Sequence, residues 1–532
     1  MKKAEKGVKG LTRREFLYRS GAGMAGMALA GVPRFSFGAK KYGGQIRIAA
    51  RYGPSNLDPH RNQDQADYVG YCMIYEGLTD IGPLPQVYMQ PLLAEKWEVL
   101  KGGREFISPL KRGVKFHHGK ELDSGDVKYS FDRIMNPKTR SAGAFALKWV
   151  DSISIVDKFA IKITMKEPYA PFLANLTVER CAIIPKDSEP TAVKPAPGTG
   201  PFVFKNFQPN ETLELTRFDN YHLIDPDTGD QLPHADGIFT KKIPDESVRM
   251  AALRAGDIDF AEQPAYNIIA DAKKNPIPGI TVDYDMPGNN VIFFNVTKPP
   301  FDNKKVRQAV AHAINRKEEM VGGYWGLGQV LHNQPFPDNS RFYIPIQMRE
   351  QNLDKARQLL AEAGYPNGFK CELFEFNFTS YLSRAPVTLD QLRKIGIEGT
   401  IKIVDRAPYF RALRTGDYGI SVGGISERMD WDDAYYMYFH SSEIGKTNLM
   451  RYNNPELDKL VEQGRSVWDS EKRRAIYKKV VEILNEDVPI IYTIDSVVGY
   501  AYRDDLKGFV KGFATRRAFH GGGVKYWWIE KS

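Results

Sequence analysis

The sequence predicts an α/β protein built from more than one domain, and three observations support this prediction. The chain has 532 residues, more than one ordinary hydrophobic core accommodates, which indicates two to four domains or subdomains. In its second half, apolar segments with helical spacing alternate with short β-like runs, the pattern of α/β layers. The composition, with 42% hydrophobic and 12% aromatic residues, is typical of a folded globular protein.

The first 38 residues are interpreted as an export signal and not as part of the fold. A basic leader contains the adjacent pair Arg13-Arg14 followed by hydrophobic residues, and then a weakly apolar, Gly/Ala-rich run over 21–32. This is the arrangement of a twin-arginine signal, whereas a chance arginine pair in a basic tail lacks the hydrophobic residues that follow. Ser36-Phe37-Gly38 has the small-x-small form of a cleavage site. We expect the twin-arginine translocase to export the chain, and the mature protein to begin near Ala39.

The leader also carries most of the net charge. Residues 1–38 hold eight Lys/Arg and two Asp/Glu, so six of the nine net positive charges lie there and about three remain for the rest. The basic balance is therefore no evidence for nucleic-acid binding. No apolar run reaches the roughly 18 residues that a bilayer crossing needs. These observations favour a soluble, monomeric periplasmic protein.

Motifs for catalysis and metal binding are missing. Cys72, Cys181 and Cys371 form no C-x-x-C pair, which excludes the common zinc and redox patterns but leaves a disulfide between two of them open. The sequence has no H-E-x-x-H, G-x-S-x-G, P-loop or Rossmann motif. The pair His117-His118 lies in a Gly-flanked stretch that favours a surface turn. We expect no enzyme activity, no cofactor and no metal; an exported enzyme is the competing class.

After the leader, the first half of the chain predicts strands, turns and one clear helix. Residues 44–50 alternate apolar and polar side chains, as a half-buried strand does. Ser124 is expected to cap a helix whose apolar residues recur at helical spacing. Residues 152–165 have the pattern of a β-hairpin. The Pro- and Gly-rich residues 194–201 mark a crossover between subdomains.

In the second half, helices and strands alternate. Asp302 is expected to cap one helix, Asn454 with Pro455 to begin another, and Ser470 a third. The strands that we expect lie at 290–295, 397–403, 418–422 and 489–494.

One segment of this half, residues 423–439, mixes charge and aromaticity. It holds five charged and five aromatic residues directly after a β-like run. Aromatic walls with a few orienting charges are typical of a pocket for a polar small molecule. The alternative is a loop that runs into an amphipathic helix with its aromatic residues packed inward. The segment alone does not decide between the two.

Ordered motifs along nearly the whole mature chain then resemble a known family. Two of them are Tyr75-Glu76-Gly77-Leu78 and Gly198-Thr199-Gly200-Pro201-Phe202. The series resembles the extracellular solute-binding proteins of ABC importers, in the family that includes dipeptide-, oligopeptide- and nickel-binding proteins. The remaining motifs of the series are 44–49 with 57–60, 93–97, 112–117 with 126–130, 217–221, 255–260, 300–309, 361–366 and 452–458.

The resemblance implies a two-lobed periplasmic binding protein of type II, of the large cluster C kind, with a hinge between the lobes. Lobe I would comprise 39–79, 200–290 and 497–532, and lobe II would be 291–496. Residues 80–199 would form an extra subdomain of lobe I. The crossovers are expected near 290–301 and 494–502. One departure from the family pattern is Pro109, which cannot donate to a ladder and predicts an edge or bulged strand.

The resemblance also suggests which residues bind the ligand. In peptide-binding members, a carboxylate after the strand equivalent to 418–422 pairs with the ligand's amino terminus, which favours the pocket interpretation of 423–439. Asp430 is the nearest candidate and Glu427 the next. Arg428 could hold a ligand carboxylate or pair internally with Glu427 or Asp432. Trp431 would form a wall of the pocket, and Tyr435 is a further candidate of the same segment. The candidates outside this segment, each of which could equally be a packing or surface residue, are Tyr52, Asn62, Gln63, Phe294, Asn295, Tyr324 and Trp325.

The expected function is that of a receptor that captures a small polar solute and delivers it to an inner-membrane ABC permease and its ATPase. A di- or oligopeptide is the expected ligand class. A nickel chelate, an opine, a sugar or another polar solute are alternatives within the same fold. A periplasmic sensor or chaperone-like scaffold is a third class beside the receptor and the enzyme.

Overall fold

The computed structural model describes most of the chain beyond the leader. The described residues are 42–61, 68–81, 89–177, 179–286, 288–377, 383–426, 430–495, 497–509 and 523–530. The predicted signal sequence and its cleavage site, together with Asn62, Gln63, Glu427 and Arg428, lie outside them. Within the described part, none of the helices combines the length and the apolar character that a bilayer crossing needs.

The largest sheet has seven strands, drawn from the first half of the chain and from its end. Its centre is β1, which pairs in parallel with β10 on one side and β11 on the other. The predicted strand at 44–50 is thus confirmed as the middle of a buried sheet. In spatial order the strands are β12 (Ile280–Asp285), β18 (Val498–Arg503), β11 (Phe260–Glu262), β1 (Gln45–Ala50), β10 (Gly237–Lys242), β9 (Thr212–Arg217) and β8 (Phe202–Gln208).

A second sheet has five strands from the second half of the chain. Its two central strands, β16 and β13, run antiparallel to each other along their whole length. The predicted strands of this half are confirmed, and β16 extends four residues beyond its expected end at 422. In spatial order the strands are β15 (Ile397–Val404), β14 (Phe369–Phe376), β16 (Ile420–Ser426), β13 (Gly288–Phe294) and β17 (Ile490–Asp495).

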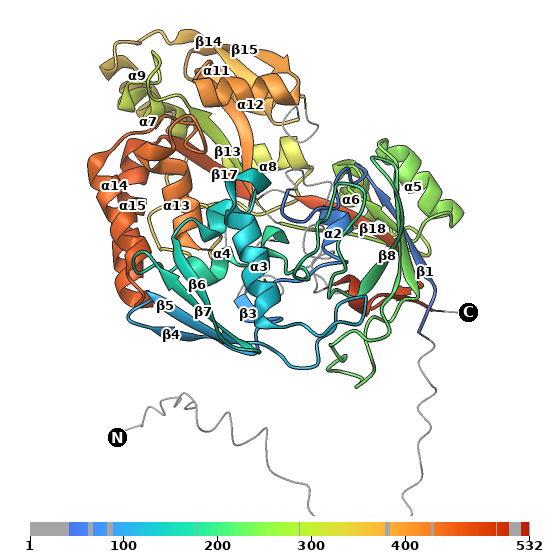
Figure 1. Cartoon of the computed structure of the whole chain (residues 1–532). Helices are drawn as coiled ribbons and strands as arrows, with labels where there is room; N and C mark the ends of the chain where they lie inside the picture. Colours follow the sequence, from blue (N-terminus) through green and yellow to red (C-terminus); the bar gives the residue numbers. More distant parts are fainter. Residues whose placement is uncertain are drawn as a thin grey trace, which may run out of the picture. The chain divides into compact units, whose positions relative to one another are not determined.

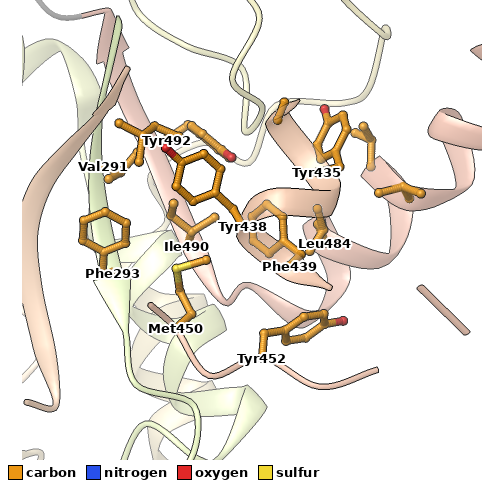
Figure 2. Packing of buried hydrophobic residues seen from close by; sticks show 14 of the residues in the cluster. Val291, Phe293, Tyr435, Tyr438, Phe439, Met450, Tyr452, Leu484, Ile490 and Tyr492 are labelled. Atoms are coloured by element: carbon orange, nitrogen blue, oxygen red, sulfur yellow. The ribbon is translucent and has the colours of Figure 1, made fainter. Parts of the chain in front are cut away.

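Helices cover both faces of the five-stranded sheet. Successive residues of a strand point to opposite faces, so β13 contributes side chains to a cluster on each face. Val291 and Phe293 of β13 join a cluster with α12 (Arg406–Thr415), α13 (Trp431–Phe439), α14 (Pro455–Ser466) and α15 (Ser470–Asp487). Figure 2 shows this cluster around Tyr438, Phe439 and Tyr492. Ile292 and Phe294 join the cluster on the other face, with α7 (Lys304–Ala313), α9 (Leu353–Glu362) and α11 (Ala385–Arg393).

The helix starts are set by side-chain caps. Asn454 caps α14 with Pro455 in its first turn, as predicted. Two predicted caps were displaced by one residue. Asp123 caps α3 (Ser124–Met135), in place of Ser124, and Asn303 caps α7, in place of Asp302. In both corrections the residue next to the predicted one supplies the side-chain oxygen that accepts the free N–H groups of the first turn.

A separate four-stranded sheet, in the order β4 (Glu98–Leu100), β5 (Glu105–Pro109), β7 (Ala160–Met165) and β6 (Val150–Asp157), lies within residues 80–199. The hairpin predicted at 152–165 is confirmed as β6 and β7. The prediction that Pro109 marks an edge or bulged strand was wrong, because β5 pairs with β4 and β7 without a register shift. Pro109 is tolerated as the last residue of β5, beyond the three residues that β4 pairs.

The chain passes between the two larger sheets twice. Residues 286–287 link β12 to β13, and residues 496–497 link β17 to β18. Figure 1 shows β13 and β17 leading toward these links. The second passage lies inside the predicted crossover at 494–502, whereas the first precedes the one predicted at 290–301. The division of the chain into domains stays a prediction.

Candidate functional site

The carboxyl edges of the two larger sheets meet at these passages. β11 and β12 both run antiparallel to β18, so they share the direction of β1 and β10. β12 leads through 286–287 into Gly288 of β13, which pairs with Ser426, the last residue of β16. β14 and β15 are parallel to each other, and β14 is parallel to β16. In open α/β sheets, ligands bind outside the carboxyl ends of the strands, so this double edge is the candidate site.

On the seven-stranded side, an arginine and an aromatic residue follow β1. The Arg51 backbone N–H donates to Glu262 Oε2 at 3.1 Å, and the Arg51 guanidinium lies 5.2 Å from the Tyr52 ring centre. Tyr52 is 52% exposed. Burial raises the pKa of Glu262 to about 7, against the opposing effects of the Arg51 N–H and of Arg249. The structure therefore places Tyr52 at the candidate edge, beside a carboxyl group that titrates near neutrality.

On the five-stranded side, Asp430 caps α13. Its side chain accepts a hydrogen bond from the Asp432 backbone N–H at 2.8 Å. The Arg473 guanidinium binds both of its carboxylate oxygens, at 2.8 Å and 2.5 Å. Both side chains of the pair are only 8% exposed. Although burial opposes it, the Asp430 carboxylate raises the pKa of Arg473. Asp430 is therefore fixed at the start of α13, with both carboxylate oxygens already bound.

A second buried ion pair follows two residues later. Asp432 receives Arg465 Nε at 3.1 Å and Nη2 at 2.9 Å. Burial raises the pKa of Asp432, while Arg465 opposes the shift. The sequence suggested Asp432 as one of two internal partners of Arg428. Asp432 is instead bound to Arg465, which lies 33 residues further along the chain. The two pairs hold the first turn of α13 against α14 and α15.

The aromatic residues of α13 pack inward. Trp431 is 3% exposed, and its Nε1–H donates to the Phe342 carbonyl oxygen at 2.7 Å. Tyr435, one helical turn on, is also buried, and the rings of both lie against Tyr477. Spacing of four residues puts these side chains on one helix face. The described contacts of Trp431 and Tyr435 are those of core residues, and a contact with ligand stays a prediction.

Phe294 and Asn295 lie at the opposite end of β13. Phe294 pairs with Ile420, whereas the carboxyl edge is at Gly288 and Ser426. Asn295 is buried and donates to the carbonyl oxygens of Gly416 and Tyr418. Their expected place at a crossover is therefore corrected, because the passage occurs before β13 and not after it.

Tyr324 and Trp325 end α8 (Arg316–Tyr324) beside the second passage. The Tyr324 hydroxyl donates to Asn290 Oδ1 at 2.8 Å, and its ring is fully buried with Ile494 and Val497. Trp325 takes a left-handed conformation with φ 57° and is 63% exposed. Trp325 therefore presents an apolar face to solvent next to the second passage, and its contact with a ligand stays a prediction. The structure thus gives the two neighbours different surroundings.

Sequence reasoning missed a buried arginine behind this edge. Arg384 is fully buried and donates to Glu319, to Thr493 and to the Gly423 carbonyl oxygen, at 3.0–3.2 Å. It thereby ties the middle of β16 to α8 and β17. Nearby Glu375, fully buried on β14, has its pKa raised to about 9 by burial, with Arg384 opposing. Neither residue left a clear signal in the sequence, because β14 also contains Lys370 and Glu372 and an acid in it is therefore not unusual.

Among the described residues, no group of three or more His, Cys, Asp or Glu side chains has an arrangement that could hold a metal ion.

Comparison with known proteins identifies the family. Residues 89–446 match the model described as bacterial extracellular solute-binding proteins, family 5. The chain is 30% identical over 480 residues to heme-binding protein A of Haemophilus influenzae, covering 84% of each. This chain belongs to that family. The resemblance found in its motifs is therefore confirmed.

Further relatives agree in fold and in class. The dipeptide-binding protein of Escherichia coli is 27% identical over 456 residues, which cover 79% of this chain and 83% of that protein. The periplasmic binding protein DppA of Helicobacter pylori, solved in complex with the peptide STSA, has a TM-score of 0.76 and 27% identity, covering 92% of this chain and 99% of that one. The fold is the two-lobed type II fold. The chain is the solute-binding component of an ABC importer and not an enzyme.

Proposed function

We propose that this protein captures a peptide-like solute where the carboxyl edges of its two larger sheets meet, and that it delivers the solute to an inner-membrane ABC permease and its ATPase. The observation that carries the proposal is the meeting of the two sheet edges at 286–287 and 496–497. A ligand bound there touches both sheets, so binding favours the conformation in which both contact it. Export by the twin-arginine translocase and release of a monomer into the periplasm complete the proposal.

The ligand amine should bind to a carboxylate of the segment after β16. Asp430 has both oxygens on Arg473, so a ligand amine would compete with a buried guanidinium for it. Glu427, the second carboxylate that the resemblance suggests, is therefore our preferred partner for the amine. Tyr52 and Trp325, which are exposed on the two sides of the passages, would supply apolar surfaces for peptide side chains.

A shift in thermal stability tests the ligand class. The peptide Ser-Thr-Ser-Ala, with which the Helicobacter pylori relative was solved, should raise the Tm in a saturable way. The same peptide with its amino group acetylated should raise it much less, because it no longer carries a positive charge. An equal shift from both peptides would contradict the proposed role of Glu427.

Heme is the second candidate, favoured by the name of the relative with 30% identity. An absorbance spectrum of the exported protein, before and after addition of hemin, separates the two candidates. A stoichiometric Soret band together with no peptide-induced Tm shift would move the assignment from peptide to heme.

A further inference from the structure

A contact between α14 and the four-stranded sheet joins two distant parts of the chain. Arg465 of α14 holds Asp432 through two hydrogen bonds, and its guanidinium carbon lies only 3.4 Å from the Tyr436 ring centre. These three residues belong to α13 and α14, which cover the five-stranded sheet. Tyr436 and Asp432 contact only part of the Arg465 guanidinium, so further side chains can pack against it.

That partner comes from residues 80–199, the segment that contains the four-stranded sheet and is called the four-stranded segment below. The rings of Trp149 and Tyr169 lie 5.1 Å and 5.5 Å from the guanidinium carbon of Arg465. The Tyr169 hydroxyl donates to Asp432 Oδ2 at 3.4 Å, and the Ala170 N–H donates to the Arg465 carbonyl oxygen at 2.8 Å. The arginine is thus enclosed by aromatic rings from both parts, which leaves its side chain 8% exposed.

The same boundary continues beyond the arginine. The ring of Trp468, just past α14, lies 5.7 Å from that of Phe106 on β5. A side-chain carbon added to Gly103 would come within 3.0 Å of the Trp468 ring. Because Gly103 also has φ +95°, the turn that leads into β5 both needs glycine and fits closely under Trp468.

The route of the chain gives this contact its meaning. The four-stranded segment continues directly into β8 of the seven-stranded sheet, whereas α13 and α14 belong to the five-stranded sheet. The chain connects these sheets only through the short passages 286–287 and 496–497. Any rotation about the passages must therefore make or break the Arg465 contact. Asp432, which takes part in it, lies at the start of the helix that follows the proposed ligand segment.

We propose that Arg465, closed by Trp149 and Tyr169, is a latch that opens and re-forms as the two lobes move, and that its closure retains the ligand. That the closed latch retains the ligand rests on the proposed function, whereas the opening of the latch is independent of it. Within the latch, the ion pair with Asp432 persists in both states, because both residues lie on the same side. The aromatic cover, the Ala170 hydrogen bond and the hydrogen bond from the Tyr169 hydroxyl to Asp432 are exchanged for contacts with water.

Amide hydrogen exchange at Ala170 measures how often the latch opens, because the Ala170 N–H donates to the Arg465 carbonyl oxygen. The experiment follows the peptide fragment that contains Ala170 by mass spectrometry, in the full mature chain. Trp149→Ala removes a half-buried ring from the cover, and Tyr169→Phe removes only the hydroxyl. Phe159→Ala is the matched control, since this half-buried ring, in the turn between β6 and β7, lies 4.8 Å from the Arg112 guanidinium and not at Arg465.

Without added peptide, Trp149→Ala should speed exchange at Ala170 on the order of tenfold, the scale of a partly desolvated cation–π contact. Tyr169→Phe should do so to a smaller extent, and Phe159→Ala should leave it unchanged. With Ser-Thr-Ser-Ala bound, exchange in the wild type should slow, and the peptide should dissociate faster from the two latch variants.

Two results would overturn the latch. One is exchange at Ala170 that stays as slow as in the centre of β7 in every variant, which would make the contact permanent. The other is equal acceleration by Phe159→Ala, which would make the effect one of general stability. If Ser-Thr-Ser-Ala fails to bind, the proposed ligand class is lost, whereas the exchange comparison without peptide still decides whether the latch opens.

Discussion

Replacing Asp430 with alanine should destabilise the protein, although resemblance to the family makes this residue a candidate for direct ligand contact. The change removes the carboxylate that binds both terminal nitrogens of Arg473, whose side chain is only 8% exposed. Only the hydrogen bond from Arg473 Nε to the Gly464 carbonyl oxygen remains. Breaking a buried pair by removing one member costs about 3–5 kcal/mol, because the remaining charge stays buried. The lost cap of α13 adds about 1 kcal/mol.

Urea unfolding of the mature protein measures this loss. Asp417→Ala is the control, because Asp417 forms a salt bridge with Lys298 at 3.4 Å while 86% exposed, and a pair of this kind contributes at most about 1 kcal/mol. The double variant with Asp430→Asn and Arg473→Met should recover part of the stability, since no unpaired charge remains. A loss below about 1 kcal/mol for Asp430→Ala, together with lost peptide binding, would refute the structural role and make Asp430 the ligand carboxylate.

Three other variants test the rest of the site. Glu427→Gln should weaken binding of Ser-Thr-Ser-Ala by at least about tenfold, the loss of one charge-assisted contact, without changing the urea midpoint; unchanged calorimetric affinity would remove Glu427 from the site. The pKa of Glu262 is raised to about 7, so the folded state binds its proton more tightly than the unfolded state does. Through this group, stability should therefore fall by up to about 1.4 kcal/mol per pH unit between pH 4.5 and 7, in addition to the fall that the raised pKa of Glu375 causes in the same range. Glu262→Gln should reduce the slope by the Glu262 contribution in pH-dependent unfolding; a slope equal to that of the wild type would assign it to other groups. Glu319 binds Arg384 and also accepts a hydrogen bond from the Thr388 hydroxyl at 2.5 Å. Arg384→Met should cost about 3–5 kcal/mol by leaving Glu319 buried without its arginine, with Arg384→Lys intermediate in urea unfolding; a loss near zero would show that Thr388 alone satisfies Glu319.

The fold could be predicted because its signals are local and ordered. Asn454 with Pro455 marks a helix start by its own chemistry, and the alternation at 44–50 marks a strand. The sequence of family motifs then supplied the two-lobed arrangement. Pro109 misled because its position within the strand, at the last residue, cannot be read from the strand's sequence.

The site was less predictable because its contacts are long-range. Asp430 and Arg473 are 43 residues apart, and Asp432 and Tyr169 are 263 apart. No spacing rule joins such residues before the sheets are assembled. The mixture of charge and aromatic residues in 423–439 was recognised correctly as unusual. Part of its cause is structural, because Asp430 and Asp432 fasten α13 while Trp431 and Tyr435 fill the core beneath it.

Mass spectrometry of the natively exported protein tests directly whether a small polar solute is held between the two lobes. Spectra recorded first under native conditions and then after denaturation should show one peptide-like molecule per chain, released only on unfolding. A repeated finding of no bound molecule, combined with no stoichiometric stability shift from peptides or hemin, would contradict the claim.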